Sequence, residues 1–357
     1  MRITLSLVIL ACLVGASGLA QSNKKLDPDA GYVPTVAPED KKKKKTEETQ
    51  ALALPPELPT AVVAETDRLA FQVTPLSSKG LLSQQTREAL KALLRSSHGT
   101  IVKLRAFVAG SGDLRRVGEI TGEMFQEKRI PLPALTVVQV GALPLEGAQI
   151  EIEATEVDRK TVNPHGVAFV AAQPAPSVAE SLAKLKTAIQ SSEALLVTCF
   201  VSSLDDQRDT QAAMSAAFPG AALDYVQMRR APATPPSSCE AIARAVKPVA
   251  SQDLALVSAP EIVFTGTQLA FGSQDSDLKL AFDRLEKALA GKGVRPNDVM
   301  LLHFYVTSSA LTYRVEALES VTAPRSVILV EALPSLDSAF GLDVIAVPEA
   351  ASPHNHD

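Results

Sequence analysis

The sequence predicts an α+β fold made of three tandem units, each with the element order β-α-β-α-β-β, packed together as an intramolecular pseudo-trimer. Two observations predict it. Segments with apolar residues at helical spacing alternate with short aliphatic runs, and this alternation occurs three times along the chain. Each unit then closes with two aliphatic runs in succession, which is typical of a mixed sheet with helices on one face.

We place the three units at residues 59–157, 160–248 and 249–349, and the middle unit is the most degenerate. Each unit begins with a short strand, which is followed by a helix whose apolar residues share one face. These residues are Ala89, Leu90, Leu93 and Leu94 in the first unit, Leu182, Leu185, Ala188 and Ile189 in the second, and Leu278, Phe282, Leu285 and Leu289 in the third.

The rest of each unit follows in a fixed order. A central strand is expected at 101–108, 194–201 and 299–306, and a second helix at 113–127, 205–218 and 311–321. Two strands joined at a proline, which we expect to pair as a hairpin, complete the units at 135–140 with 149–154, 223–227 with 238–243, and 326–331 with 342–347. Because these strands are apolar on both sides, the face without helices must be covered. The other two units, packed around a threefold axis, are the simplest cover, so we expect a monomer.

The two ends of the chain lie outside the units. Residues 1–20 contain Arg2, an apolar stretch too short for a comfortable membrane span, and a small-residue cleavage site at Gly18-Leu19-Ala20, which together indicate a signal peptide. A buried N-terminal helix is the alternative. Residues 21–58, with five lysines at 41–45, and residues 350–357 are expected to be disordered. We therefore expect a periplasmic or secreted protein without a membrane span.

Cys199 and Cys239 remain once the signal peptide, which holds Cys12, is removed. They fall in two predicted strands of the middle unit. An oxidising compartment permits a disulfide, but the bond requires Cα atoms within about 7 Å of each other. We expect two buried free thiols rather than a disulfide.

Several kinds of site find no support in the sequence. The net charge of −5 offers no basic face for nucleic acid, and no phosphate-binding loop or paired Cys-His metal spacing occurs. We therefore expect no metal and no cofactor. His303 lies in the central strand of the third unit, where we expect a core residue; a catalytic base is the alternative.

Arg325 is the most informative residue of the chain. It starts an apolar run that ends at Leu333-Pro334, and the same place counted back from the closing proline holds Leu135 and Leu223 in the other units. The planar fork of donors on a guanidinium suits a carboxylate. Arg325 therefore either binds a carboxylate ligand or forms a salt bridge between units, with Asp343 as the candidate partner.

The third unit resembles the RidA enamine/imine deaminase family. The resemblance rests on the segments 264–268, 291–294, 298–299 and 304–306, and on Pro324-Arg325-Ser326 with Leu333-Pro334. In the first unit, Leu143-Pro144 and the run 150–154 match the closing signature of the family. The middle unit matches in the rhythm of its helices and strands and in 240–243.

This resemblance implies a chorismate-mutase-like fold with clefts between neighbouring units, and the hydrolysis of 2-imino or enamine acids to 2-keto acids and ammonia. It implies that Arg325 binds the substrate carboxylate and that Asp343 positions the attacking water, which makes them the candidate catalytic residues. Glu151, Gly266 and Tyr305 join Arg325 as candidate substrate-binding residues. Gly266 stands where the family has a serine, which removes one polar contact.

Two functions remain open. One is an exported enamine/imine deaminase with a single active cleft at Arg325, because Leu135 and Leu223 cannot bind a carboxylate. The other is a non-catalytic RidA-like module that binds a small carboxylate-bearing metabolite or a protein partner. The retained arginine favours the first. Export favours the second, because the enamines that the family handles arise mostly from cytoplasmic amino-acid chemistry.

Overall fold

The computed structural model describes residues 54–190, 192–230, 236–245, 254–257, 259–316 and 323–348. All of them belong to the body that runs from Ala53 to Asp357. The predicted signal peptide, the lysine run and the C-terminal tail lie outside the described residues. In the described part of the chain, no helix is both long enough and apolar enough to cross a membrane.

The predicted order β-α-β-α-β-β is confirmed in the first two parts of the chain, and the third part follows it with one additional short strand before its first helix. The first contains β2 (Leu69–Val73), α1 (Leu82–Ser96), β3 (Thr100–Ala109), α2 (Leu114–Glu127), β4 (Ala134–Val140) and β5 (Ile150–Val157). The second contains β6 (Val167–Ala175), α3 (Val178–Ile189), β7 (Glu193–Val201), α4 (Gln207–Ala217), β8 (Ala222–Gln227) and β9 (Ser237–Arg244). The third contains β11 (Glu261–Thr265), β12 (Gln268–Phe271), α5 (Asp275–Ala290), β13 (Val299–Val306), α6 (Ser309–Glu316), β14 (Arg325–Leu329) and β15 (Ser338–Ala346).

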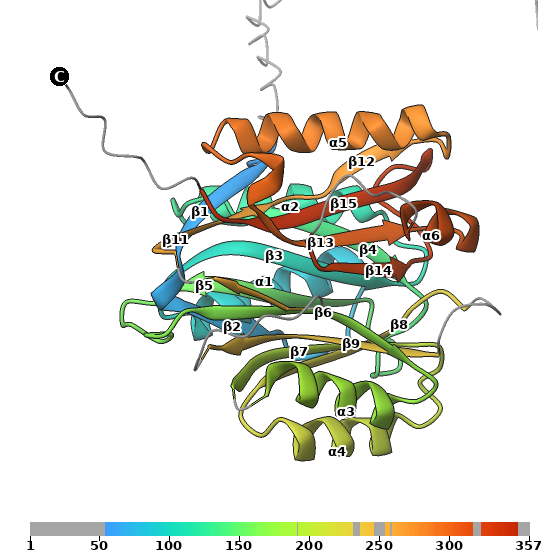
Figure 1. Cartoon of the computed structure of the whole chain (residues 1–357). Helices are drawn as coiled ribbons and strands as arrows, with labels where there is room; N and C mark the ends of the chain where they lie inside the picture. Colours follow the sequence, from blue (N-terminus) through green and yellow to red (C-terminus); the bar gives the residue numbers. More distant parts are fainter. Residues whose placement is uncertain are drawn as a thin grey trace, which may run out of the picture. The chain divides into compact units, whose positions relative to one another are not determined.

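Each part forms a mixed sheet (Figure 1). Sheet 1 has the order β2-β5-β3-β4, sheet 2 has the order β10-β6-β9-β7-β8, and sheet 3 has the order β1-β11-β15-β13-β14 with β12 also paired to β15. The expected hairpin between the last two strands is wrong. The last-but-one strand pairs parallel with the central strand, as β4 does with β3, because a helix connects them. The last strand must therefore pair with the opposite edge of the central strand, as β5 does.

Two short strands cross from one part of the chain to the sheet of another. β1 (Ala61–Glu65) precedes sheet 1 in sequence but pairs antiparallel with β11 of sheet 3. β10 (Leu254–Val257) precedes sheet 3 in sequence but pairs antiparallel with β6 of sheet 2. Through these strands, the segment before β2 becomes part of sheet 3 and the segment before β11 becomes part of sheet 2.

The helices cover one face of each sheet, as the apolar spacing predicted. In sheet 1, for example, Leu90 of α1 and Ile120 of α2 pack against Leu104 of β3 in one buried cluster. Side-chain caps fix where two of the helices begin: Asp113 accepts from the N–H of Arg115 at α2, and Ser177 accepts from the N–H of Glu180 at α3.

The other faces of the three sheets contact one another. Phe107, Phe200 and Tyr305, the aromatic residues near the ends of the three central strands, are fully buried in one shared cluster. A second shared cluster contains Leu69, Phe169 and Phe264 from the three outer strands. Each sheet is thus covered by the other two, while the threefold axis and the monomeric state stay predictions.

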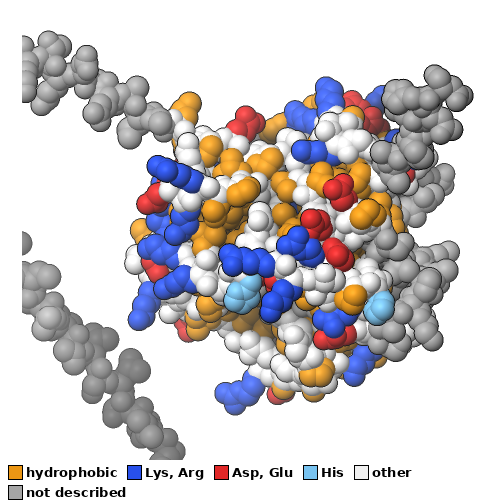
Figure 2. Space-filling view, turned by 90° about the vertical axis from the view of Figure 1, so that its left-hand side faces the viewer, with side chains coloured by type: hydrophobic (Ala, Val, Ile, Leu, Met, Phe, Trp, Pro, Cys, Tyr) orange, Lys and Arg blue, Asp and Glu red, His pale blue; other side chains and the backbone are white. Residues whose placement is uncertain are grey.

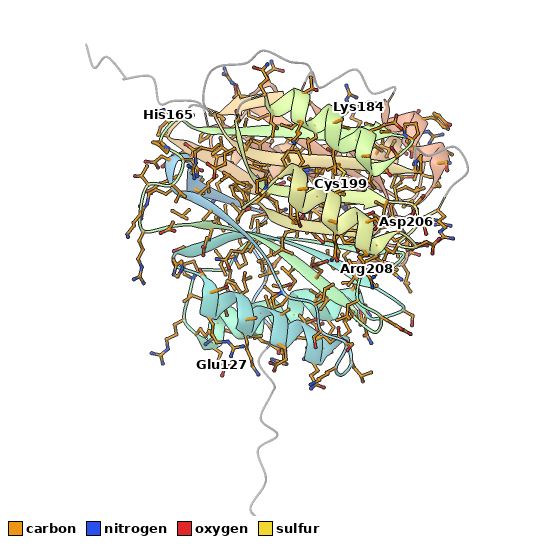
Figure 3. The ribbon with its side chains drawn as sticks, turned by 90° about the horizontal axis from the view of Figure 1, so that it is seen from below. Glu127, His165, Lys184, Cys199, Asp206 and Arg208 are labelled. Atoms are coloured by element: carbon orange, nitrogen blue, oxygen red, sulfur yellow. A yellow bond between two sulfur atoms is a disulfide. The ribbon has the colours of Figure 1, made fainter. Side chains whose placement is uncertain are left out.

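The expectation of free thiols is wrong, because Cys199 and Cys239 form a disulfide. The two residues are directly opposite each other on β7 and β9, with Cα atoms 4.1 Å apart. Figure 3 shows α3 and α4 lying over the strand that carries Cys199. The sequence did not reveal the pairing, since the proximity of the two residues depends on the register of these strands.

Candidate functional site

Matching positions on the three central strands carry different polar side chains. Arg105 on β3, Thr198 on β7 and His303 on β13 each lie two residues before the shared aromatic position. Each is paired with an acidic residue on the last strand of its own sheet, namely Glu153, Glu240 and Asp343 respectively. All six are buried at the place where the sheets meet.

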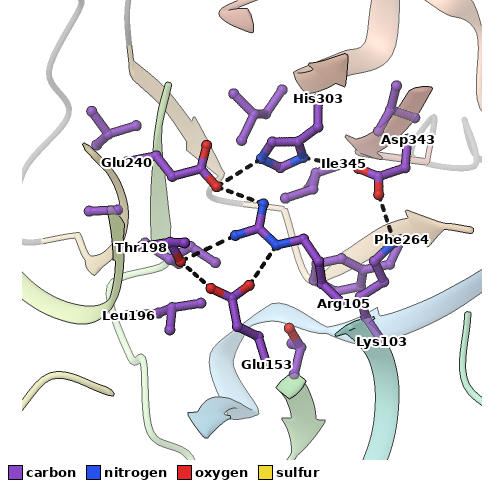
Figure 4. A pocket seen from close by; sticks show the side chains of 16 residues that line it. Lys103, Arg105, Glu153, Leu196, Thr198, Glu240, Phe264, His303, Asp343 and Ile345 are labelled. Carbon is purple, nitrogen blue, oxygen red and sulfur yellow. Dashed lines mark hydrogen bonds and ion pairs between the residues drawn. The ribbon is translucent and has the colours of Figure 1, made fainter. Parts of the chain in front are cut away.

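Arg105 is the centre of this cluster (Figure 4). Its Nε donates to Glu153 Oε2 at 2.6 Å, its Nη1 to Glu240 Oε1 at 2.7 Å, and its Nη2 to Thr198 Oγ1 at 3.2 Å. The guanidinium also lies over the ring of Phe107, 5.2 Å from its centroid. One arginine of sheet 1 thereby binds carboxylates from sheets 1 and 2.

His303 and Lys103 extend the cluster to sheet 3. The Nδ1 atom of His303 is 3.0 Å from Asp343 Oδ1, and its Nε2 atom is 3.4 Å from Glu240 Oε1. Lys103 Nζ donates to Asp343 Oδ2 at 3.0 Å, and Thr136 Oγ1 donates to the same oxygen. We call these residues, Lys103, Arg105, Thr136, Glu153, Thr198, Glu240, His303 and Asp343, the central network.

The protonation states in the central network follow from these contacts. Burial acts to lower the pKa of His303, but the carboxylates of Glu240 and Asp343 outweigh it and raise this pKa to about 9. Burial acts to raise the pKa of Glu240, but Arg105 and His303 lower it to about 2. Burial also acts to raise the pKa of Asp343, but Lys103 and His303 hold this pKa well below its usual range. His303 is therefore protonated at neutral pH.

A cavity of about 50 Å³ lies against the central network. Its walls combine network side chains with apolar residues such as Leu196, Phe264 and Ile345. The network has three cationic and three anionic side chains, and its charges are paired with one another rather than turned toward an open cleft. The arrangement is thus suited to holding the sheets together. The expectation that His303 is a satisfied buried residue agrees with these contacts.

Arg325 lies outside the central network. On β14 it is paired with Leu302, just as Leu135 is paired with Leu104 on sheet 1 and Leu223 with Val197 on sheet 2. Because Leu104, Val197 and Leu302 each precede the Arg105, Thr198 and His303 positions, the three residues do occupy matching places. The equivalence predicted from the closing prolines is therefore present in the strand register.

The two candidate carboxylates do not match each other. Asp343 is opposite His303 and so corresponds to Glu153, whereas Glu151 is opposite Phe107. The places that match Glu151 hold Ser238 on β9, opposite Phe200, and Gly341 on β15, opposite Tyr305. Counted from the closing prolines Pro144 and Pro334, Glu153 and Asp343 each lie nine residues on, which agrees with the strand register.

Glu151 faces a second buried acid on another sheet. Asp224 of β8 is 1% exposed, and within the described residues neither of its carboxylate oxygens has a hydrogen-bond donor. Burial is the main cause that raises the pKa of Glu151 to about 7, and burial together with the adjacent Glu151 raises that of Asp224 well above its usual range. These two residues, which we call the acid pair, therefore hold a proton near neutral pH.

The remaining candidates also lie apart from Arg325. The N–H of Gly266 donates to Thr60 O, and a Cβ atom at Gly266 would lie 2.9 Å from Leu135 O, so this glycine lies at the interface that contains Leu135. Tyr305 is fully buried, and its hydroxyl is 3.4 Å from Asp343 Oδ2. The structure brings Tyr305 and Asp343 together, but it places Gly266, Glu151 and Arg325 at separate places.

Sequence reasoning missed most of the central network. Lys103, Arg105, Glu153 and Glu240 were not singled out, although Lys103-Leu104-Arg105 and Glu151-Ile152-Glu153 show polar residues alternating within otherwise apolar strands. Charged residues at every second position of a buried strand indicate a polar interface on one face. Among the described residues, no group of three or more His, Cys, Asp or Glu side chains is placed to hold a metal ion.

Comparisons with known proteins identify one segment. Residues 66–157, which span sheet 1 and its helices, match the family model described as endoribonuclease L-PSP, the model of the RidA/YjgF family. No curated protein matches the chain.

Solved structures that match the chain include members of the YjgF/UK114 family. A YjgF/YER057c/UK114 family member from Mycobacterium tuberculosis is 21% identical, with 26% of this chain and 82% of that chain covered and a TM-score of 0.22. TdcF of E. coli with bound serine is 24% identical, with 29% and 90% covered and a TM-score of 0.23. A chorismatase is 13% identical, with 82% and 80% covered and a TM-score of 0.40.

The family match covers β2 through β5, and the same element order recurs in the other two parts of the chain. That the second and third parts are copies of the first stays a prediction. Residues 66–157 of the chain are RidA-like.

Proposed function

We propose that this RidA-like protein binds a small carboxylate-bearing metabolite, such as a 2-keto or 2-imino acid, through Arg325. The proposal is based on the strand register, which places Arg325, Leu135 and Leu223 at matching positions of the three sheets. Of these three positions, the one on sheet 3 has a guanidinium and the other two have leucine side chains. Arg325 is only half-buried at the start of β14. Ligand binding is also the step that both functions suggested by the sequence share.

The position of the acidic residues supports binding without hydrolysis. Ser326, next to Arg325, accepts a hydrogen bond from the N–H of Ala172 on β6, so β14 lies against sheet 2. The place on sheet 2 that matches Glu151 is Ser238, which has no carboxylate to position a water molecule. Asp343 is bound to Lys103 and His303 in the central network.

Calorimetric titration with a 2-keto acid tests this proposal. We expect one site per chain. Since a charge-assisted hydrogen bond contributes about 1.5–3 kcal/mol, Arg325→Ala should weaken binding roughly 10- to 150-fold. Arg325→Lys should recover part of the affinity, because an ammonium lacks the planar fork. Leu135→Ala is the matched control and should leave affinity unchanged.

Two results would change the proposal. Equal affinity in the wild-type chain and in Arg325→Ala would make Arg325 a structural residue. Ammonia release from a freshly generated 2-imino acid, abolished in Arg325→Ala, would replace binding by enamine/imine deamination at the same place.

We also propose that the protein is exported. The pattern of Arg2, an apolar stretch and Gly18-Leu19-Ala20 supports cleavage before Gln21. Mass spectrometry of the N-terminus from the native envelope fraction tests it. A chain that keeps residues 1–20 in the cytoplasm would contradict export.

A further inference from the structure

Sheet 1 differs from the other two sheets at the outer edge of β2. In sheet 2 the outer strand β6 pairs with β10, and in sheet 3 the outer strand β11 pairs with β1. Among the described residues, β2 pairs with β5 alone. Within the described part of the chain, sheet 1 therefore has an unpaired outer edge at the place where the other two sheets have a paired one.

The strand register shows which residues of the outer strands correspond. Phe71 is opposite Thr155, Phe169 is opposite Ile242, and Phe264 is opposite Ile345. Thr155, Ile242 and Ile345 each lie two residues after the acidic residue of the central network on the same strand. Phe71, Phe169 and Phe264 therefore occupy matching places, which allows the three edges to be compared residue by residue.

The backbone of β2 has groups that point away from its own sheet. The N–H of Thr74 donates to Ile152 O, and the N–H of Asp158 donates to Arg68 O. The backbone N–H and C=O groups of the even-numbered residues of β2 therefore point toward β5. The N–H and C=O groups of Phe71 and Val73 therefore point outward. On sheet 3, Gly266 is the residue that matches Val73, and its N–H donates to Thr60 O next to β1.

Burial differs in the same way. Val167, Ala168, Phe169 and Val170 on β6 are all buried, as are Ile262, Val263, Phe264 and Thr265 on β11. Their counterparts on β2 after the buried Leu69, namely Ala70, Phe71 and Gln72, are only partly buried, and so is Val73. Figure 2 shows the side of the molecule that faces left in Figure 1, where apolar side chains lie at the surface among charged ones.

The chain's own connecting segment does not fill this place. β1 and β10 are the segments that precede β2 and β11, and the corresponding segment before β6 is residues 158–166. That segment forms a turn instead: the N–H groups of Val162 and Asn163 donate to Asp67 O, and the Asn163 side chain donates to Leu69 O. It thus contacts the beginning of β2, and among the residues that the structure describes no strand pairs with the outward backbone groups of Phe71 and Val73.

We propose that the outer edge of β2 binds an extended segment of a partner protein as an added antiparallel strand. The two strands that fill the matching edges define its chemistry, since both are short, aliphatic and antiparallel to their neighbours. Residues of the partner that pair with Phe71 should be aliphatic, as Val62 is opposite Phe264. Residues opposite Gln72 should be small or polar, because the Gln72 side chain donates to Glu156. This inference is independent of the proposed function at Arg325.

Amide hydrogen exchange measured by NMR on the full chain tests the open edge directly. In the free protein, the Phe71 amide should exchange at least about tenfold faster than the Phe264 amide, because only the latter faces a paired strand. A synthetic peptide with the sequence of residues 60–66 is then added as the probe. We expect it to slow exchange at Phe71 and Val73 without changing exchange in β1.

N-methylated versions of the probe provide the matched control. In the register of β1 on β11, the backbone of Val62 and Ala64 faces the receiving strand, and that of Ala61 and Val63 faces away. N-methylation at Val62 and Ala64 should weaken binding roughly tenfold or more, because two backbone hydrogen bonds are lost. N-methylation at Ala61 and Val63 should have little effect.

Four results would overturn the proposal. Equal protection of Phe71 and Phe264 in dilute free protein would mean that the chain covers its own edge. Protection that rises with protein concentration would identify a second copy as the occupant. Equal affinity of the two methylated peptides would exclude strand addition, and so would the absence of binding by the methylated peptides and by the unmethylated peptide. Exchange that increases in β1 on addition of the probe would show binding at β11 instead.

Discussion

The central network and the acid pair are both buried between sheets, but they solve the problem of buried charge in opposite ways. In the central network, the carboxylates of Glu153, Glu240 and Asp343 face Arg105, His303 and Lys103 at ion-pair distances. In the acid pair, Glu151 and Asp224 face each other, and within the described residues Asp224 has no donor for its oxygens. One cluster therefore keeps its charges by pairing them, and the other keeps a proton.

A single chain can place different side chains at matching positions of its three sheets, which an assembly of identical subunits cannot. In an assembly of identical subunits, the places of Arg105, Thr198 and His303 would hold the same residue three times, and like charges in one buried place repel. Here these three places hold one guanidinium, one hydroxyl and one imidazole. Each interface between sheets can therefore have its own chemistry.

Removing the cation at the centre of the central network should have the largest effect among the tests that compare this network with the acid pair. Arg105→Met should lower the free energy of unfolding by about 3–5 kcal/mol, because it leaves Glu153 and Glu240 buried without their main cation. Urea unfolding followed by far-UV circular dichroism measures it. Arg116→Met is the control, since Arg116 pairs with Glu119 and Glu123 at the surface and should have little effect. Similar losses in both variants would contradict a network held by Arg105.

The second test uses the pH dependence of His303. Its folded-state pKa of about 9 lies above the value of about 6.5 in an unfolded chain. A raised pKa gives stability that is complete below pH about 6.5 and is lost as the pH rises through 9. The loss should be roughly 3 kcal/mol between these limits. Chemical unfolding measured from pH 6 to 10 should show this slope, and His303→Gln should flatten it. An unchanged slope in the variant would mean that His303 is not charged in the folded state.

The sequence predicted the order of elements better than their pairing. Apolar spacing located the helices and strands, because burial of one face is a local property of the sequence. The Cys199–Cys239 disulfide, the exchange of β1 and β10, and the place of the last strand all depend on contacts between distant segments. Such contacts leave no periodic signal in a single sequence.

The candidate site shows the same limit. The match of Arg325 with Leu135 and Leu223 could be found by counting from a shared proline, because no insertion separates them from it. The same count matches Asp343 with Glu153, which each lie nine residues after the closing proline, although Glu151 and not Glu153 was the predicted binding residue. The partners of Asp343, which are Lys103, Thr136 and His303, come from two sheets and could not be predicted from neighbouring sequence.

The smallest test concerns the acid pair. The pKa of Glu151 is raised to about 7, mainly by burial, compared with about 4.3 in an unfolded chain. A raised pKa gives stability that is complete below the unfolded value and is lost as the pH rises through 7, in a lower window than that of His303. The wild-type chain should therefore lose roughly 2 kcal/mol between pH 5 and pH 8 through this group.

Glu151→Gln isolates this contribution, because an amide of similar size does not ionise and can donate a hydrogen bond to Asp224. The free energy of unfolding of the variant should fall less between pH 5 and pH 8 than that of the wild-type chain. Because the proton belongs to both acids, Asp224→Asn should reduce the slope in the same window. Glu146→Gln, a substitution of an exposed glutamate, is the control and should keep the wild-type slope. If both acid-pair variants also kept it, Glu151 would be ionised at neutral pH and would require a cation to face it, which would make the two clusters alike.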